Sequence, residues 1–117
     1  MTLLNKIIGK WQITHMDQWD VEPDYYIEFN NRGSGSFHFI CVDADIDYRT
    51  KERPTEKVEF TFHGYDECDE VSGRGWVKIN GSELEGYFVF HQGDESGFRA
   101  KLIKQKSKAA RKVKNVV

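Results

Sequence analysis

Apolar and polar residues alternate with a period of two along most of the chain between Trp11 and Leu102. Successive side chains of a β-strand point to opposite sides of the sheet, so this period is typical of strands that bury one face. Turn-forming sequences such as Asn80-Gly81 separate the alternating runs, and no helical pattern between them is long enough to connect parallel strands. The pattern predicts about eight strands, each antiparallel to the one before it.

A sheet built from such strands has two open edges unless its first strand pairs with its last. A chain of 117 residues forms one domain with one core, and closure into a barrel removes both edges. We therefore predict an all-β fold, a single antiparallel up-and-down barrel over residues 1–103 that begins with a short helical turn at residues 2–8. A basic tail follows at residues 104–117, either as a weak amphipathic helix or as a solvated terminus.

The apolar positions change from odd to even numbers near Val42, where the alternation predicts a β-bulge or a tight turn. Before this point, Cys41 shares the inward face with Phe37 and Phe39. After it, the inward face continues at Ala44. The alternation therefore places the Cys41 side chain inside the barrel.

The number of cysteines indicates the cellular compartment in which the protein is expected. The chain has only Cys41 and Cys68, which do not form the disulfide framework of a small secreted domain, so both are predicted to be reduced thiols. The N-terminal segment has no apolar stretch long enough for a signal peptide or a membrane span. These features predict a cytoplasmic protein without a membrane partner.

Charge is unevenly distributed along the chain. All 19 acidic residues lie before residue 101, whereas 7 of the 17 basic residues lie after residue 100. An acidic body with a basic tail has three candidate partners for that tail: nucleic acid, another acidic protein, or the body itself. The tail has no aromatic residue for base stacking and the acidic body repels phosphates, which argues against nucleic acid.

Aromatic residues make up 14% of the chain and dominate the predicted interior. An eight-stranded barrel is just wide enough for side chains to fill it or for one small ligand to remain inside, and both alternatives stay open. Inward glycines at Gly73, Gly75 and Gly86 leave room either for a ligand or for a neighbouring ring. The residues expected to line a ligand pocket are Trp11, Phe39, Tyr48, Phe60, Phe62 and Phe88.

A second apolar set alternates with the inward positions of the last three strands and consists of Trp76, Tyr87, Val89 and Ile103. On adjacent antiparallel strands these residues would form one outer patch, and an exposed apolar patch usually marks an interface. Three interpretations remain: a homodimer face, a docking surface for the chain's own tail, or inward residues whose strand phase is misassigned.

Three carboxylates lie two residues apart on one strand face, at Asp43, Asp45 and Asp47. With the acids of residues 66–70 they could offer oxygen ligands to calcium or magnesium, but the spacing is not that of an EF-hand. Solvated charge, paired across strands with Arg49, Arg74 or Lys78, is the preferred interpretation. The four histidines lack the spacing of a zinc site, so we predict no metal and no cofactor.

An enzyme is the weakest interpretation. No serine lies in a nucleophile-elbow pattern, and no glycine run resembles a phosphate-binding loop. The polar groups that an active site would need to bring to one barrel mouth are Asp47, Arg49, Asp66, Glu67, Arg74 and Asp94.

Several short motifs together resemble a known group of proteins. They include Gly9-Lys10-Trp11, Ile46-Asp47-Tyr48-Arg49, Val58-Glu59-Phe60, Gly73-Arg74-Gly75-Trp76 and His91-x-Gly93-Asp94. Through them, residues 8–102 resemble short bacterial lipocalin-like (calycin-type) β-barrel proteins of unknown function. The resemblance implies a barrel with Trp11 closing one end, and it brings no catalytic or ligand-binding residues. True lipocalins pack an arginine over this tryptophan, whereas Arg99 occupies an outward position here.

Two functions from different classes follow from these patterns. The first is non-enzymatic binding of a small apolar or amphipathic ligand inside the barrel. The alternative is a solid-core interaction module that acts through the outer aromatic patch, either as a homodimer or with a partner protein.

Overall fold

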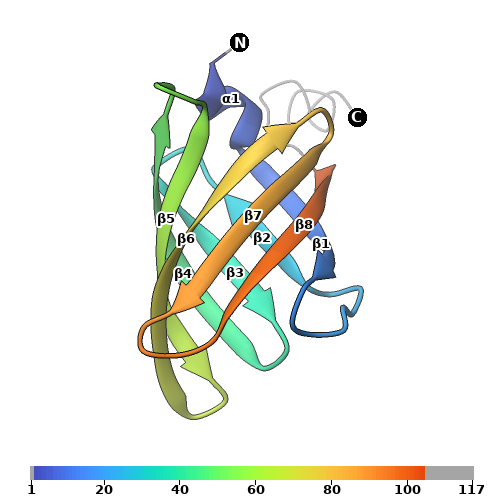
Figure 1. Cartoon of the computed structure of the whole chain (residues 1–117), viewed down its shortest axis with the longest axis vertical. Coiled ribbons are helices and arrows are strands. Elements are labelled where there is room, and N and C mark those ends of the chain that lie inside the picture. The colour runs from blue at the N-terminus through green and yellow to red at the C-terminus, as the bar shows by residue number, and fades with distance from the viewer. Residues whose placement is uncertain (1, 105–117) are drawn as a thin grey trace, which may run out of the picture.

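The computed structural model describes residues 2–104 and confirms the all-β prediction. Eight antiparallel strands close into one barrel in chain order, β1-β2-β3-β4-β5-β6-β7-β8 (Figure 1). The elements are α1 (Leu3–Ile7), β1 (Gly9–Met16), β2 (Tyr26–Phe29), β3 (Ser34–Phe39), β4 (Val42–Lys51), β5 (Lys57–Asp66), β6 (Asp69–Asn80), β7 (Glu83–Phe90) and β8 (Glu95–Lys104). Pairing of β1 with β8, at Trp11 opposite Leu102 and Ile13 opposite Ala100, closes the ring. Beyond Lys104, the predicted basic tail lies outside the described residues.

The apolar and polar residues that alternate along the sequence are alternately buried and exposed in the strands. In β4, Val42, Ala44, Ile46 and Tyr48 are buried, while the residues between them are exposed. The inward faces of the strands together form one core, as expected when a closed sheet turns one face toward its own interior. Its aromatic members are Trp11, Tyr25, Phe29, Phe37, Phe39, Tyr48, Phe60, Phe62, Phe88 and Phe98.

Helix α1 covers the upper end of the barrel in Figure 1. The Thr2 side chain accepts a hydrogen bond from the Asn5 backbone N–H and caps the helix start. Leu3 and Ile7 are buried against the core. The Trp11 indole N–H donates to the Ile7 carbonyl at 2.9 Å. Trp11 therefore closes this end as expected, and its polar atom is satisfied by the helix.

A second tryptophan lies at the opposite end, in the connector between β1 and β2. The ring centroid of Trp19 is 5.7 Å from that of Phe39 and 6.1 Å from that of Phe88. Trp19 is partly buried and packs against the core. The alternation of the sequence does not predict this core position, because Trp19 lies in a connector and belongs to no strand.

The inward glycines make room for phenyl rings. A Cβ atom at Gly73 would lie 2.5 Å from the Phe62 ring, and one at Gly75 would lie 2.6 Å from the Phe60 ring. These distances are far shorter than van der Waals contact, so ring atoms already occupy the space of the missing side chains. Of the two alternatives, room for a neighbouring ring is the one observed.

Two turns differ in detail from their predictions. A two-residue turn at Ile40 and Cys41 joins β3 to β4, with φ of 53° at Ile40. The change of parity near Val42 thus reflects a tight turn, and the inward placement of Cys41 is wrong because this residue is exposed in the turn. The Asn80-Gly81 hairpin forms as predicted, but Asn80 pairs with Glu83. Gly81, with φ of 67°, therefore begins the turn.

Candidate functional site

The six residues predicted to line an inner pocket are all buried in the core. The most exposed of them, Tyr48, has a relative exposure of 6%. Their rings contact one another and the rest of the core: Phe39 and Phe88 have centroids 5.0 Å apart, and Phe37 lies 5.3 Å from Phe88. These are ordinary distances between packed aromatic rings. The rings therefore occupy the space around the barrel axis.

Polar groups inside the barrel are also satisfied. The Tyr48 hydroxyl donates to the Asn30 carbonyl. Ser96, the buried polar residue of the core, donates to the Gly97 carbonyl and accepts from the Gln18 backbone N–H. Within residues 2–104, no buried side-chain nitrogen or oxygen lacks a hydrogen-bond partner. No unsatisfied group among these residues points inward to orient a ligand.

A groove of about 770 Å³ lies on the outer face of β4, β5, β6 and β7. Strand register arranges its outward side chains in two rows. Arg49, Glu59, Trp76 and Tyr87 form one cross-strand row, and Asp47, Thr61, Arg74 and Val89 form the other. We refer to this hollow as the outer groove.

The apolar part of the outer groove comes from β6 and β7. Trp76 and Tyr87 stand opposite each other with ring centroids 6.4 Å apart and ring planes at 26°. Val89 lies opposite Arg74 in the neighbouring row. All three apolar side chains are half-buried on the outer face. Their strand phase was therefore assigned correctly, which removes the third interpretation for these residues.

The charged part of the outer groove contains two arginines that form no ion pair with the described part of the chain. Glu59 lies 3.9 Å from the Lys51 ammonium and 3.6 Å from that of Lys57. Within residues 2–104, neither Arg49 nor Arg74 forms an ion pair, and neither does Asp47. The expected cross-strand pairs between these arginines and the β4 carboxylates are therefore not observed. Both guanidinium groups are free to meet an anion.

Ile103 does not join the other three residues of the predicted patch. It is 53% exposed and lines a separate hollow of about 350 Å³ with Lys10, Gln12 and Tyr26. The cause is strand register: Tyr87 stands opposite Gly97, so Ile103 lies farther along β8. The predicted patch is thus a cluster of three residues, and Ile103 belongs to a different part of the surface.

The polar groups considered for an active site also separate. Asp47, Arg49 and Arg74 meet in the outer groove. Asp66 and Glu67 lie at the turn between β5 and β6, and Asp94 lies in the turn between β7 and β8. These six groups therefore do not share one barrel mouth.

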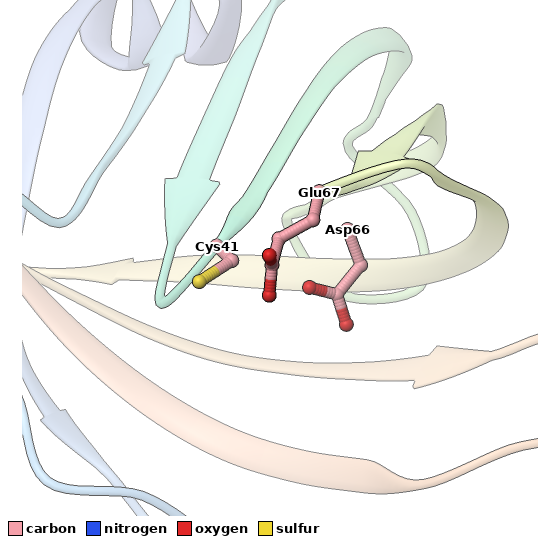
Figure 2. A group of neighbouring side chains, drawn as sticks. All are labelled: Cys41, Asp66 and Glu67. Atoms are coloured by element: carbon pink, nitrogen blue, oxygen red, sulfur yellow. The ribbon is translucent and has the colours of Figure 1, made fainter.

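Two neighbouring turns bring Cys41, Asp66 and Glu67 together (Figure 2). One possible ligand atom from each side chain lies within 4.8 Å of the others, and all three residues are exposed. Desolvation and the nearby carboxylates, first that of Glu67, raise the pKa of the Cys41 thiol. A protonated thiol is a poor nucleophile and a poor metal ligand. The raised pKa therefore lowers the reactivity of the Cys41 thiol.

His38 forms a polar contact that sequence spacing did not reveal. Its Nδ1 lies 3.0 Å from the Val42 carbonyl and 2.8 Å from the Asp43 carboxylate, while Nε2 lies 3.1 Å from the Asp24 carboxylate. Carbonyls and carboxylates only accept hydrogen bonds, so these three contacts favour the imidazolium form, in which both ring nitrogens donate. Burial alone would lower the pKa of His38, but the bonds with Asp24 and Asp43 outweigh it and raise the pKa. His38 thereby joins the β1–β2 connector to β4.

Comparisons with protein-family models, curated proteins and solved structures find no match for this chain. Three of the motifs that carry the lipocalin-like resemblance nevertheless meet in space. The segments 46–49, 58–60 and 73–76 each contribute residues to the outer groove. Within residues 2–104, no helix is long and apolar enough to span a membrane.

Proposed function

We propose that this barrel is a non-enzymatic binding protein with a solid core, and that it binds a small amphipathic ligand in the outer groove. The observation that carries the proposal is the combination, in one hollow, of an aromatic surface, Trp76 and Tyr87, with two arginines that form no ion pair within residues 2–104. A hollow of about 770 Å³ lies within the size range of small-molecule sites. The outward side chains of the groove combine three apolar residues with five polar or charged ones, which suits an amphipathic ligand.

Binding inside the barrel is the less favourable location. A ligand there would have to displace core rings such as Phe37 and Phe88, which are fully buried. Removing a buried phenyl ring from a packed core typically costs about 3–5 kcal/mol. The outer groove requires no such displacement, which supports moving the expected ligand site from the interior to the outer face.

A second copy or a partner protein is the alternative occupant of the outer groove. Tyrosine and tryptophan are enriched in protein interfaces, so Trp76 and Tyr87 also suit this role. The hollow shape of the surface favours a small molecule, because two identical concave faces would enclose empty space.

The proposal includes a cytoplasmic location and membership of the bacterial lipocalin-like group. Cys41 and Cys68 are both free and exposed, which suits a reducing compartment. The closed eight-stranded topology suits the group that the motifs resemble.

Fluorescence titration with N-phenyl-1-naphthylamine, a neutral aromatic probe, tests the location of the site. The wild-type chain is expected to bind one probe molecule. Trp76→Ala should abolish binding by removing the aromatic surface, and Thr61→Trp should abolish it by filling the outer groove from β5. Tyr65→Ala is the matched control, because Tyr65 is an aromatic residue that is 53% exposed and lies outside the groove.

Circular dichroism of each variant must show the wild-type spectrum for these comparisons to hold. Undiminished probe binding by both Trp76→Ala and Thr61→Trp would contradict the proposal. A second result would also contradict the proposal. In it, the wild-type chain binds no probe and sediments as a dimer, and Thr61→Trp dissociates that dimer.

A further inference from the structure

Arg49 and Arg74 occupy diagonal positions in the outer groove. They lie on β4 and β6, in different rows, with Glu59 and Thr61 of β5 between them. Two strand spacings of about 4.8 Å and a two-residue offset of about 7 Å put their Cα atoms about 12 Å apart. Two long arginine side chains can approach one small group from opposite sides across this distance.

The charged residues around these arginines favour the binding of an anion. Glu59 lies within 4 Å of two lysines, Lys51 and Lys57, so these two residues bring two more positive charges to the edge of the groove. The two arginines together with these lysines make four cationic groups against the two carboxylates of the groove, Asp47 and Glu59. A guanidinium matches the geometry of a carboxylate or a phosphate, to which it donates two parallel hydrogen bonds. The groove therefore carries an excess positive charge in a form suited to an organic acid.

The register of β6 with β7 also determines which side chains lie beside Arg74. Arg74 stands opposite Val89, and Trp76, two residues along the same strand, stands opposite Tyr87. An acid held by the arginines would thus have its apolar part on the Trp76 and Tyr87 rings. The Asp47 carboxylate can accept a hydrogen bond from a donor elsewhere on the same molecule.

We infer that the outer groove selects an aromatic or otherwise apolar organic acid, a carboxylic acid or a phosphate monoester, whose anionic group is held between Arg49 and Arg74. This inference rests on the proposed function and narrows it to a class of ligand. The expected ligand has one acidic group, an apolar body of the size of an aromatic ring, and one hydrogen-bond donor.

Two fluorescent probes that differ by one charged group test the inference. 1-Anilinonaphthalene-8-sulfonate is the sulfonate of the neutral probe N-phenyl-1-naphthylamine. The wild-type chain is expected to bind the anionic probe about two- to fivefold more tightly for each arginine that contacts it, because both arginines are exposed. The double variant Arg49→Gln/Arg74→Gln should lose this preference and keep its affinity for the neutral probe. A higher salt concentration should weaken the binding of the anionic probe and leave the binding of the neutral probe unchanged.

Arg32→Gln is the matched control, because Arg32 is exposed in the turn between β2 and β3 and lies outside the groove. Displacement of the bound anionic probe then separates the two sources of acid. Phenylacetate and phenyl phosphate carry a carboxylate and a phosphate on the same ring, and 2-phenylethanol is the neutral equivalent. Displacement by either acid and none by the alcohol is the expected result.

Equal affinity of the wild type and the double arginine variant for the anionic probe would overturn the inference. Equal displacement by 2-phenylethanol and the two acids would do the same. In both cases the proposed function survives if Trp76→Ala still abolishes binding of the neutral probe. If Trp76→Ala binds the neutral probe as tightly as the wild type, the proposed function is wrong as well.

Discussion

At the scale of single residues, the core is built from glycines and phenylalanines that complement each other. A Cβ atom at Gly86 would lie 2.6 Å from the Phe98 ring. Gly73 and Gly75 face the rings of Phe62 and Phe60 in the same way. Sequence alternation predicted which glycines point inward. It could not decide between a ligand and a ring as their neighbour, because that choice depends on the side-chain rotamers of other strands.

Gly75→Ala should destabilise the barrel by about 1–3 kcal/mol, the usual effect of adding volume to a packed core. The added methyl group would lie 2.3 Å from the Tyr87 carbonyl oxygen as well as 2.6 Å from the Phe60 ring. Urea denaturation measures the change in the free energy of unfolding. Ser72→Ala, an outward position on the same strand, serves as the control and should change it by less than about 0.5 kcal/mol. Similar effects of the two substitutions would mean that the interior has free space.

At the scale of elements, the predictions were best where alternation is uninterrupted. In β5, Val58, Phe60 and Phe62 are buried in regular alternation with more exposed residues. The β3–β4 hairpin was less well predicted, because a two-residue turn and a β-bulge both shift the parity of the apolar positions. Connectors have no alternation, which is why the packing of Trp19 and the contacts of Asp24 were not foreseen.

The contact between the β1–β2 connector and β4 should make stability depend on pH through His38. Its folded-state pKa lies above the unfolded value of 6.5, so the stabilisation is complete below that pH and is lost as the pH rises through the folded-state pKa. Comparing the free energy of unfolding at about pH 6 and pH 8, we expect the wild type to lose more stability than His38→Gln.

The groups that face His38 are Asp24, Asp43 and the rings of Tyr25 and Tyr26. Asp24→Asn should therefore reduce the pH dependence without removing it. His91→Gln is the control, because this exposed histidine makes no ion pair within residues 2–104. A pH dependence equal in the wild type and His38→Gln would exclude the imidazolium contact.

At the scale of the whole molecule, closure of the sheet turns one face inward and leaves the outer face for recognition. The sequence pattern was sufficient to predict a closed antiparallel barrel and the outward cluster of Trp76, Tyr87 and Val89. It was not sufficient to place Arg49 and Arg74 beside them. Those residues meet only through the registers of β4 with β5 and of β5 with β6, and register depends on where each hairpin turns.

The proposed function requires a filled barrel interior and a ligand site on the outer face. Its most direct test is an NMR titration with 1-anilinonaphthalene-8-sulfonate that follows the three tryptophan indole N–H signals. We predict that the Trp76 signal shifts on binding. The Trp11 signal, held by the Ile7 carbonyl, and the Trp19 signal at the opposite barrel end should remain in place. Shifts of Trp11 or Trp19 with an unmoved Trp76 would contradict the proposed function and place the ligand inside the barrel.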